Sequence, residues 1–250
     1  MKPILSSSIA QTPFYPSLRM SALLSLDRVS KRFGYRTILD NICFSLNSGE
    51  FVMLIGNNGA GKSTLLRIIN SLMKPTRGTI SFRGTNQKEH LQELLQIMGN
   101  LSHESRLYGD LNSKDNLRIF GTLYGVKELN FKINNILEQI DLAHVAQLPV
   151  RNFSSGMTKR LMIGRLMLCQ PEILILDEPY TGLDQHTFRW FQHYLREFHQ
   201  QGGTVLMVTH QLELGLELAT RVLVLHQQSI RHDVSVAGLS VDQCSDWLEE

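Results

Sequence analysis

Residues 56–64 are Gly56-Asn57-Asn58-Gly59-Ala60-Gly61-Lys62-Ser63-Thr64, and they match the phosphate-binding pattern G-x-x-x-x-G-K-[ST] at every fixed position. The apolar run 51–55 precedes this stretch, and residues 65–69 continue from it with helical character. The glycines allow several backbone N–H groups to point at one anion, and the N-terminus of a helix adds its positive end. The order of strand, loop and helix therefore predicts a phosphate-binding loop in an α/β fold.

Two side chains of this loop have the chemistry that a nucleoside triphosphate requires. Lys62 supplies a point charge for the β and γ phosphates, and the Ser63 hydroxyl offers an oxygen to Mg²⁺, which prefers oxygen ligands. We therefore expect residues 56–64 to bind a nucleotide together with Mg²⁺. The alternative is a glycine-rich turn that happens to precede a helix, and the flanking patterns argue against it.

Residues 173–178, Ile-Leu-Ile-Leu-Asp-Glu, are predicted to form a second element of the same site. A strand this apolar must be covered on both faces, and ligands bind at the carboxyl ends of strands in open parallel sheets. We expect Asp177 to hold Mg²⁺ directly or through water, and Glu178 to accept a proton from the attacking water or to orient it. A solvated strand end is the alternative. The chain lacks the N-K-x-D element of guanine-specific proteins, which favours ATP over GTP.

Composition narrows the class of protein. The 250 residues include 25 Lys and Arg against 23 Asp and Glu, which gives no strong electrostatic case for nucleic acid binding. The apolar runs are far shorter than the roughly 20 residues that span a bilayer, so we expect no membrane crossing. Cys43, Cys169 and Cys244 form no C-x-x-C pair, which fits a reducing compartment.

The rest of the chain divides into segments. Residues 1–19 are expected to be a disordered extension, with Met20 as an alternative start. Strands over 23–29 and 36–46 flank the turn Phe33-Gly34-Tyr35, and one of its rings could stack on a base or pack on the sheet. Helical spacing dominates from 103 to about 160, and strands and helices alternate again from 173 to 234. The pattern predicts an α/β fold with a mainly parallel central sheet.

A third motif is the stretch Phe153-Ser154-Ser155-Gly156-Met157. It resembles the L-S-G-G-Q signature of the nucleotide-binding subunits of ATP-binding cassette (ABC) transporters, and the order of motifs extends this resemblance over residues 20–235. Ser154 and Gly156 keep the positions that matter most for phosphate approach, whereas 153, 155 and 157 depart from the pattern. Ser154 can cap the helix that runs to Cys169, and in the family this helix N-terminus faces the γ-phosphate held by the opposite subunit.

The resemblance implies roles for further residues. Thr181-Gly182-Leu183-Asp184 matches the family's D-loop, so Asp184 is expected beside ATP. His210, at the end of a strand, takes the place of the switch histidine that bonds the γ-phosphate and helps to fix the attacking water. His103 stands where most members have the Q-loop glutamine and is expected to contact metal-bound water, with Glu104 as the alternative. Phe33 lies where the family's adenine-stacking ring lies.

The resemblance also implies the architecture and the partners. We expect a P-loop NTPase core with an N-terminal antiparallel β subdomain and a helical subdomain at about 103–160, all within an ABC ATPase domain at 20–235, followed by a tail at 236–250. The active form would be a homodimer, or a pair with a related ATPase. A membrane permease would dock in a groove lined by Leu107, Tyr108 and Leu111, which places the chain at the cytoplasmic face of the membrane. Nucleic acid is not an expected partner.

Two resemblances bear on the cargo. Residues 102–111, 116–117 and 123–126 resemble the ATPase subunit of the haem exporter used in cytochrome c maturation, and Ser155-Gly156-Met157 with Lys159-Arg160-Leu161 points the same way. The chain also resembles ATPases of the wider ABC-2 export group, whose cargoes include drugs and polysaccharides. We therefore predict an exporter ATPase, with haem as the cargo and an ABC-2 cargo as the alternative. A soluble ABC ATPase acting on ribosomes or DNA is a further alternative.

Overall fold

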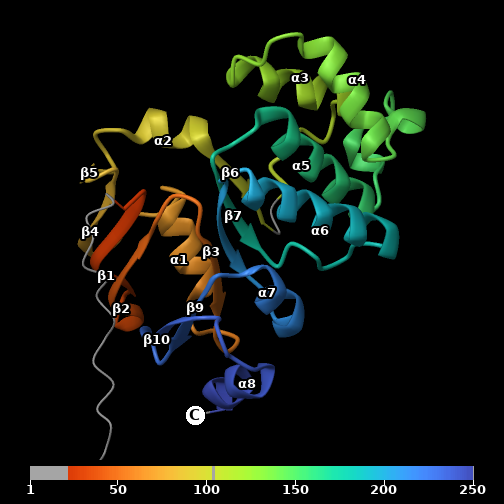
Figure 1. Cartoon of the computed structure of the whole chain (residues 1–250). Helices are drawn as coiled ribbons and strands as arrows, with labels where there is room; N and C mark the ends of the chain where they lie inside the picture. The colour runs from red at the N-terminus through yellow and green to blue at the C-terminus, as the bar shows by residue number, and fades with distance from the viewer. Residues whose placement is uncertain (1–21, 103–104, 250) are drawn as a thin grey trace, which may run out of the picture.

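Two β-sheets carry the fold of residues 22–102 and 105–249, the part of the chain that the computed structural model describes. The strands are β1 Leu24–Phe33, β2 Arg36–Leu46, β3 Phe51–Ile55, β4 Arg77–Phe82, β5 Thr85–Asn86, β6 Met98–Leu101, β7 Ile173–Asp177, β8 Thr204–Val208, β9 Arg221–His226 and β10 Ser229–Ser235. The helices are α1 Lys62–Ile69, α2 Leu91–Ile97, α3 Ser113–Leu123, α4 Leu129–Gln139, α5 Ser155–Cys169, α6 Gln185–Gln200, α7 Leu212–Leu218 and α8 Val241–Glu249. Figure 1 shows their arrangement.

The smaller sheet is the expected antiparallel β subdomain, with strand order β2-β1-β4-β5. Its first hairpin turns at Gly34 and Tyr35, where Gly34 has a φ of 56°, a backbone conformation that glycine adopts without steric penalty. The prediction that Phe33 lies in the turn is wrong, because Phe33 is the last residue of β1 and pairs with Arg36. The pairing extends the strand to the edge of the hairpin.

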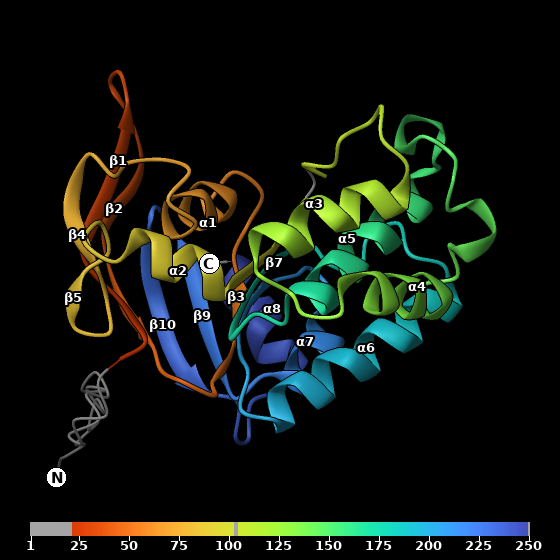
Figure 2. The ribbon, with the colours of Figure 1, turned by 90° about the horizontal axis from the view of Figure 1, so that it is seen from above.

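The larger sheet is mainly parallel, as predicted, with strand order β10-β9-β3-β8-β7-β6. Strand β3 lies between β8 and β9 and runs parallel to both, and β10 alone is antiparallel to its neighbour β9. Helix α1 lies between the two sheets, while α6 covers the opposite face of the larger one (Figure 2). The strands are thus covered on both faces, as their continuous apolar sequences require.

Successive residues of β3 belong to two different cores. Val52 and Leu54 pack with α1 and the smaller sheet, whereas Met53 and Ile55 pack on the other face with residues such as Phe191 of α6. This period of two is the geometry of a strand. Fully burying one such apolar side chain contributes roughly 1.5–3 kcal/mol. Both faces therefore hold the strand firmly, and the loop after Ile55 begins from a fixed point.

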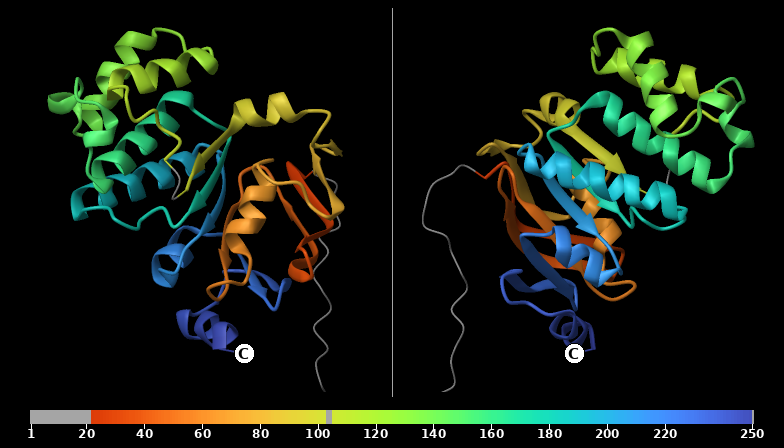
Figure 3. Two further views of the ribbon diagram at one scale, coloured as in Figure 1. Left: turned by 180° about the vertical axis from the view of Figure 1, so that it is seen from behind. Right: turned by 45° about the vertical axis from the view of Figure 1, so that its right-hand side comes forward.

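The helical subdomain has a third core of its own. Leu117 of α3, Ile133 and Leu137 of α4, and Leu161 and Leu168 of α5 are buried together. In Figure 3, α3 and α4 lie at one end of the molecule and α8 lies at the other. Helix α5 contributes to this core and to the core under α6, so it joins the helical subdomain to the central sheet.

Two short helices were not predicted from the sequence. Helix α7 has seven residues and follows β8, and α8 has nine residues and lies within the expected tail at 236–250. Helices this short give too few turns for a clear periodic signal. Helix α8 is anchored by buried Cys244 and by Trp247, whose ring stacks on that of His232 at 4.5 Å. The predicted extension at 1–19 lies outside the described residues.

Candidate nucleotide-binding and hydrolysis site

The loop at 56–64 connects the carboxyl end of β3 to the first turn of α1, as the sequence predicted. Gly59 and Gly61 have φ values of 81° and 109°, so the loop turns through conformations that favour glycine. Gly56 is required for a different reason: a Cβ at this position would lie 2.3 Å from the Leu225 carbonyl oxygen of β9. Asn57, Asn58, Gly59 and Ser63 are exposed, and Ala60, Gly61 and Thr64 are half-buried. The loop is thus closely packed at its start and open to solvent at its tip.

Lys62 is the one buried cation of this loop. Its ammonium donates hydrogen bonds to the carbonyl oxygens of Gly56, at 2.6 Å, and Asn57, at 3.1 Å. Burial lowers the pKa of Lys62, while the nearby charges of Glu178 and Asp177 act in the opposite direction. The structure therefore brings the loop lysine and the second acidic motif into one electrostatic environment, as the sequence predicted.

The two predicted carboxylates follow each other at the end of β7. Asp177 is buried and pairs in register with Val208 of β8, and the Glu178 backbone N–H donates to the Val208 carbonyl oxygen at 2.9 Å. The Glu178 backbone has a φ of 48°, in the left-handed region that non-glycine residues rarely adopt. Such a conformation costs about 1 kcal/mol or more and persists only where surrounding bonds hold it.

His210 lies beside Glu178, after the end of β8. The His210 backbone N–H donates to Glu178 Oε2 at 3.4 Å, and His210 Nε2 lies 3.4 Å from Glu178 Oε1. Oε1 is buried and has no hydrogen-bond partner among the described residues, because its contact with His210 is close enough for an ion pair but is not a hydrogen bond. A buried carboxylate oxygen without a donor can accept a proton or hold a water molecule. The arrangement suits a group that acts on water.

The oxygen donors here fit Mg²⁺. Asp177 offers a carboxylate and Ser63 a hydroxyl, which are the hard ligands that Mg²⁺ takes. Within residues 22–102 and 105–249, no group of three or more His, Cys, Asp or Glu side chains could hold a metal ion. Mg²⁺ usually completes its shell with water and substrate phosphates, so a two-residue donor set is consistent with Mg²⁺ bound together with a nucleotide.

The signature-like motif begins helix α5, as expected. Ser154 is the N-cap: its Oγ accepts a hydrogen bond from the Met157 N–H at 3.2 Å. Ser154 and Ser155 are exposed, and Gly156 and Met157 are half-buried. A Cβ at Gly156 would lie 3.7 Å from the Gly182 carbonyl oxygen, so the motif adjoins the D-loop of its own chain.

Asp184 caps the N-terminus of α6. Its Oδ1 accepts from the Thr187 N–H at 2.8 Å, and its Oδ2 accepts from the Thr187 hydroxyl at 3.0 Å. The hydrogen bond from the Thr187 backbone lowers the pKa of the Asp184 carboxyl below its ordinary value. Asp184 is exposed, so the carboxylate that caps α6 can also contact a ligand held by another subunit.

The predicted base-stacking ring lies in the described part of the chain, whereas the predicted Q-loop position does not. Phe33 is half-exposed, and the Lys31 ammonium lies 5.0 Å from its ring centroid. Tyr35 is fully exposed, so both rings are accessible and the choice between them for base stacking stays a prediction. His103 and Glu104, the two candidates for the Q-loop role, lie outside the described residues.

Sequence reasoning assigned no role in this site to Lys159, and it did not predict the contact that Asn57, one of the expected ATP-binding residues, makes with α8. Lys159 of α5 donates from Nζ to the Glu178 carbonyl oxygen at 2.8 Å. Asn57 donates from Nδ2 to the Leu248 carbonyl oxygen of α8 at 2.6 Å. Only the position of Lys159, five residues after Ser154 on a helix that precedes the acidic strand, gave a signal in the sequence.

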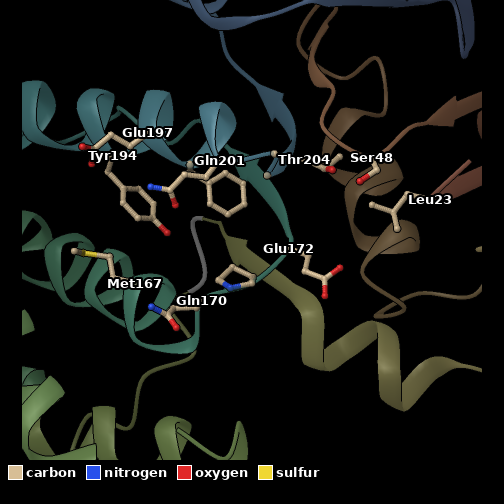
Figure 4. A pocket seen from close by; sticks show the side chains of 13 residues that line it. Leu23, Ser48, Met167, Gln170, Glu172, Tyr194, Glu197, Gln201 and Thr204 are labelled. Carbon is tan, nitrogen blue, oxygen red and sulfur yellow. The ribbon is translucent and has the colours of Figure 1, made fainter. Parts of the chain in front are cut away.

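A hollow of about 470 Å³ lies elsewhere and is not part of this site. It is lined at the amino ends of β7 and β8 by residues such as Glu172 and Thr204, together with Met167 of α5 and Tyr194 of α6 (Figure 4). The acidic motif lies at the opposite, carboxyl end of β7. Since ligands of open parallel sheets bind at the carboxyl ends, this hollow is not the nucleotide site.

The family model described as ABC transporter matches residues 39–181, more than half of the chain, and includes both the phosphate-binding loop and the acidic motif. This chain is an ABC transporter ATPase. The ATPase is 35% identical over 190 residues to the lantibiotic transport ATP-binding protein of Streptococcus pyogenes. The aligned region covers 76% of this chain and 81% of that relative. It is 30% identical over 233 residues to the ABC transporter ATP-binding protein NatA of Bacillus subtilis, covering 90% and 95%.

Solved structures agree with this fold. An ATP-binding subunit of an ABC transporter superposes on the ATPase with a TM-score of 0.83 at 27% identity, covering 91% of this chain and 100% of that chain. A dimeric ATP-binding cassette bound to ADP and Pi has a TM-score of 0.77 at 24% identity, covering 85% and 98%, and supports the fold alone. The predictions of the ABC ATPase fold and of ATPase activity are confirmed.

The prediction of haem as the cargo is not supported by the relatives found, whose names concern lantibiotic transport, Nod factor export in Ralstonia nicotianae and daunorubicin resistance in Streptomyces coeruleorubidus. They favour the ABC-2 alternative. Across the part of the chain that the structure describes, no helix is both long and apolar enough to cross a bilayer.

Proposed function

We propose that this ATPase is the energy-coupling subunit of an ABC-2 type exporter, and that it hydrolyses ATP at a site completed by a second ATPase subunit. The observation that carries the proposal is the meeting of Lys62, Asp177, Glu178 and His210 at the carboxyl ends of β3, β7 and β8. A relative named for Nod factor export supports the export direction.

Each side chain has a role that follows from its position. Lys62, now bonded to carbonyl oxygens of its own loop, redirects its ammonium to the β and γ phosphates. Ser63 and Asp177 provide oxygen ligands for Mg²⁺, which neutralises phosphate charge when bound. Glu178 holds the attacking water through its unpartnered Oε1 and accepts its proton, and His210 lies beside that oxygen to bond the γ-phosphate.

The second half of the site comes from another subunit. Ser154 and Ser155 are exposed, so the N-terminus of α5 can face an anion, with the positive end of the helix dipole behind these residues. In a dimer, Ser154 through Met157 and Asp184 of one subunit would close on the nucleotide held by residues 56–64 of the other. Closure excludes water and strengthens each charge interaction with the phosphates. Loss of the γ-phosphate then releases the two subunits.

A permease partner would contact the seam between the central sheet and the helical subdomain. Leu107 packs on the cores of both parts, and half-exposed Tyr108 rests near Phe120 of α3, with 6.2 Å between ring centroids. The Tyr124 hydroxyl donates to the Leu95 carbonyl oxygen of α2 at 3.1 Å, which bridges the same seam. A cytoplasmic helix of a permease inserted here would sense relative movement of the two parts.

The experiment is co-purification from native membranes. Tagged Glu178→Gln protein, loaded with ATP and Mg²⁺, should retain a polytopic permease. Tagged Lys62→Met protein lacks the phosphate contact, so the addition of ATP should increase its recovery of the permease less than it does for Glu178→Gln. Identification of the permease and of any co-purified small molecule by mass spectrometry gives the cargo class. An absorbance band of haem in the complex would restore the haem prediction. Recovery with ribosomes or DNA and without any membrane protein would contradict the exporter proposal.

A further inference from the structure

Lys159 is a buried cation that lies behind the acidic motif. Lys159 is only 9% exposed, although it belongs to helix α5, whose first turn is at the surface. Its Nζ donates to the Glu178 carbonyl oxygen at 2.8 Å. Burial lowers the pKa of the Lys159 ammonium, and the charges of Glu178 and Asp177 oppose that shift. A buried ammonium persists only where bonds and opposite charges compensate its loss of hydration.

Two lysines therefore flank one pair of carboxylates. Lys62 approaches from α1, which lies between the two sheets, and Lys159 approaches from α5, whose residues belong to the core on the other face. They differ in their partners. Lys62 bonds carbonyl oxygens of the phosphate-binding loop, whereas Lys159 bonds the backbone of the carboxylate residue itself. Lys159 is thus placed to orient that residue rather than to hold phosphate.

The backbone of Glu178 depends on such support. It has a φ of 48°, and three hydrogen bonds hold it: its N–H donates to Val208, and its carbonyl oxygen accepts from Lys159 Nζ at 2.8 Å and from the Thr181 N–H at 3.3 Å. With both sides of the residue fixed, the side chain points to His210. Without the ammonium, the carbonyl oxygen would keep only the longer hydrogen bond from Thr181, and the strained conformation would lose the shorter of its two carbonyl hydrogen bonds.

We propose that Lys159 is a positioning residue for the hydrolytic carboxylate: its ammonium fixes the Glu178 carbonyl and joins the helix that begins with the signature motif to the strand end that bears Asp177 and Glu178. This inference rests on the proposed role of Glu178. Because Lys159 follows the capping residue Ser154 by about one and a half helical turns, a shift of α5 is transmitted to Glu178 through one bond. The motif that engages the partner's nucleotide is thereby coupled to hydrolysis in its own chain.

The test compares steady-state ATP hydrolysis by the full-length chain and its variants. Lys159→Met, of similar length but without the ammonium, should lower kcat about tenfold or more and leave KM for ATP within about twofold, because a misplaced carboxylate affects the chemical step and not nucleotide binding. Lys159→Arg keeps a charged donor and should recover kcat to within about threefold of the original. Lys159→Gln ends one atom short and should behave as the methionine variant does, and it serves if that variant is insoluble.

A matched control removes a half-buried cation that also donates to a backbone carbonyl. Arg221 Nη1 donates to the Ser45 carbonyl oxygen at 2.9 Å, and Arg221 is paired with Asp233 and Glu50. It lies at the start of β9, away from the carboxyl ends of the strands. Arg221→Met should lower the melting temperature at least as much as Lys159→Met does, with kcat unchanged. If Lys159 only stabilised the fold, Lys159→Met would also lower the melting temperature and leave kcat unchanged.

The double variant completes the test. If Lys159 acts through Glu178, Lys159→Met adds no further loss of kcat in a Glu178→Gln background. A kcat of Lys159→Met within twofold of the original chain, or failure of arginine to restore it, would overturn the proposal even where Glu178→Gln has a far lower kcat than the original chain. A Glu178→Gln variant that hydrolyses ATP at the original rate would overturn the role of Glu178, and the inference on Lys159 with it.

Discussion

The cap of helix α6 provides a prediction that can be worked through from the structure. Asp184→Ala removes two acceptors, since Oδ1 is bonded to the Thr187 N–H at 2.8 Å and Oδ2 to the Thr187 hydroxyl at 3.0 Å. The helix that they cap has 16 residues and buries Phe191 and Leu195 in the core beneath it. Loss of the cap therefore leaves the Thr187 N–H and hydroxyl without their acceptors on a helix that covers one face of the central sheet.

The expected change is about 1 kcal/mol in the free energy of unfolding, which is the typical effect of replacing a capping Asp by Ala. For a domain of this size, 1 kcal/mol lowers the melting temperature by about 2–4 °C. Asp184→Asn retains one oxygen acceptor and should lower the melting temperature by less than half of that amount. The difference between Ala and Asn thus measures the cap and not the charge.

The pH dependence has a definite sign. The Thr187 backbone hydrogen bond lowers the pKa of Asp184 from 3.8, so the carboxyl is more acidic in the folded chain than in the unfolded chain. Its charged form therefore stabilises the fold above pH 3.8, and this contribution is lost as the pH falls through the lower folded value. The difference in stability between the original chain and Asp184→Ala should be constant from pH 7 to pH 5 and should shrink below pH 3.8.

The assay is thermal and urea unfolding followed by circular dichroism, at steps from pH 7 to pH 3. Asp110→Ala is a control, because Asp110 is an exposed aspartate that pairs with Arg151 and caps no helix among the described residues. Its effect should stay below about 0.5 kcal/mol. Equal melting temperatures for the original chain and Asp184→Ala, or a difference that grows as the pH falls, would refute the reasoning.

Three further predictions concern the nucleotide loop and the base. Gly56→Ala places a Cβ 2.3 Å from the Leu225 carbonyl oxygen and should destabilise the fold by about 1–3 kcal/mol, seen as a lower urea midpoint; an unchanged midpoint contradicts the contact. Lys62→Met should weaken binding of a fluorescent ATP analogue more than that of the free nucleoside, and equal losses would argue against a phosphate role. Phe33→Ala should weaken ATP binding by about 1–3 kcal/mol if its ring stacks on the base, with Tyr35→Ala as the control; the reverse order assigns the stack to the tyrosine.

The sequence predicted the central elements because each has a local physical signature. The strand before Gly56 and the strand before Asp177 are continuous apolar runs, which only a sheet covered on both faces accommodates. The cap at Ser154 was predictable because a hydroxyl side chain before a helix is a local feature. Patterns that repeat within a few residues are thus readily recognised.

Long-range contacts could not be predicted in this way. The bond from Asn57 to Leu248 joins residues 191 positions apart, and nothing in either local sequence indicates it. Lys159 resembles a surface lysine by type, and only the packing of α5 on the sheet buries it. The exact end of β1 at Phe33 depends on pairing with β2, which carries the strand four residues beyond the predicted end at 29.

The central claim is that two copies of this ATPase, or this chain and a related one, enclose ATP between the loop at 56–64 and the motif at 153–157. The most direct measurement is the molar mass of purified Glu178→Gln protein by light scattering, with ATP and Mg²⁺, with ADP and Mg²⁺, and with neither. We predict a dimer only with ATP, and loss of that dimer in the double variant with Lys62→Met. A monomer at saturating ATP, or a dimer whose mass is independent of the nucleotide, would contradict the account.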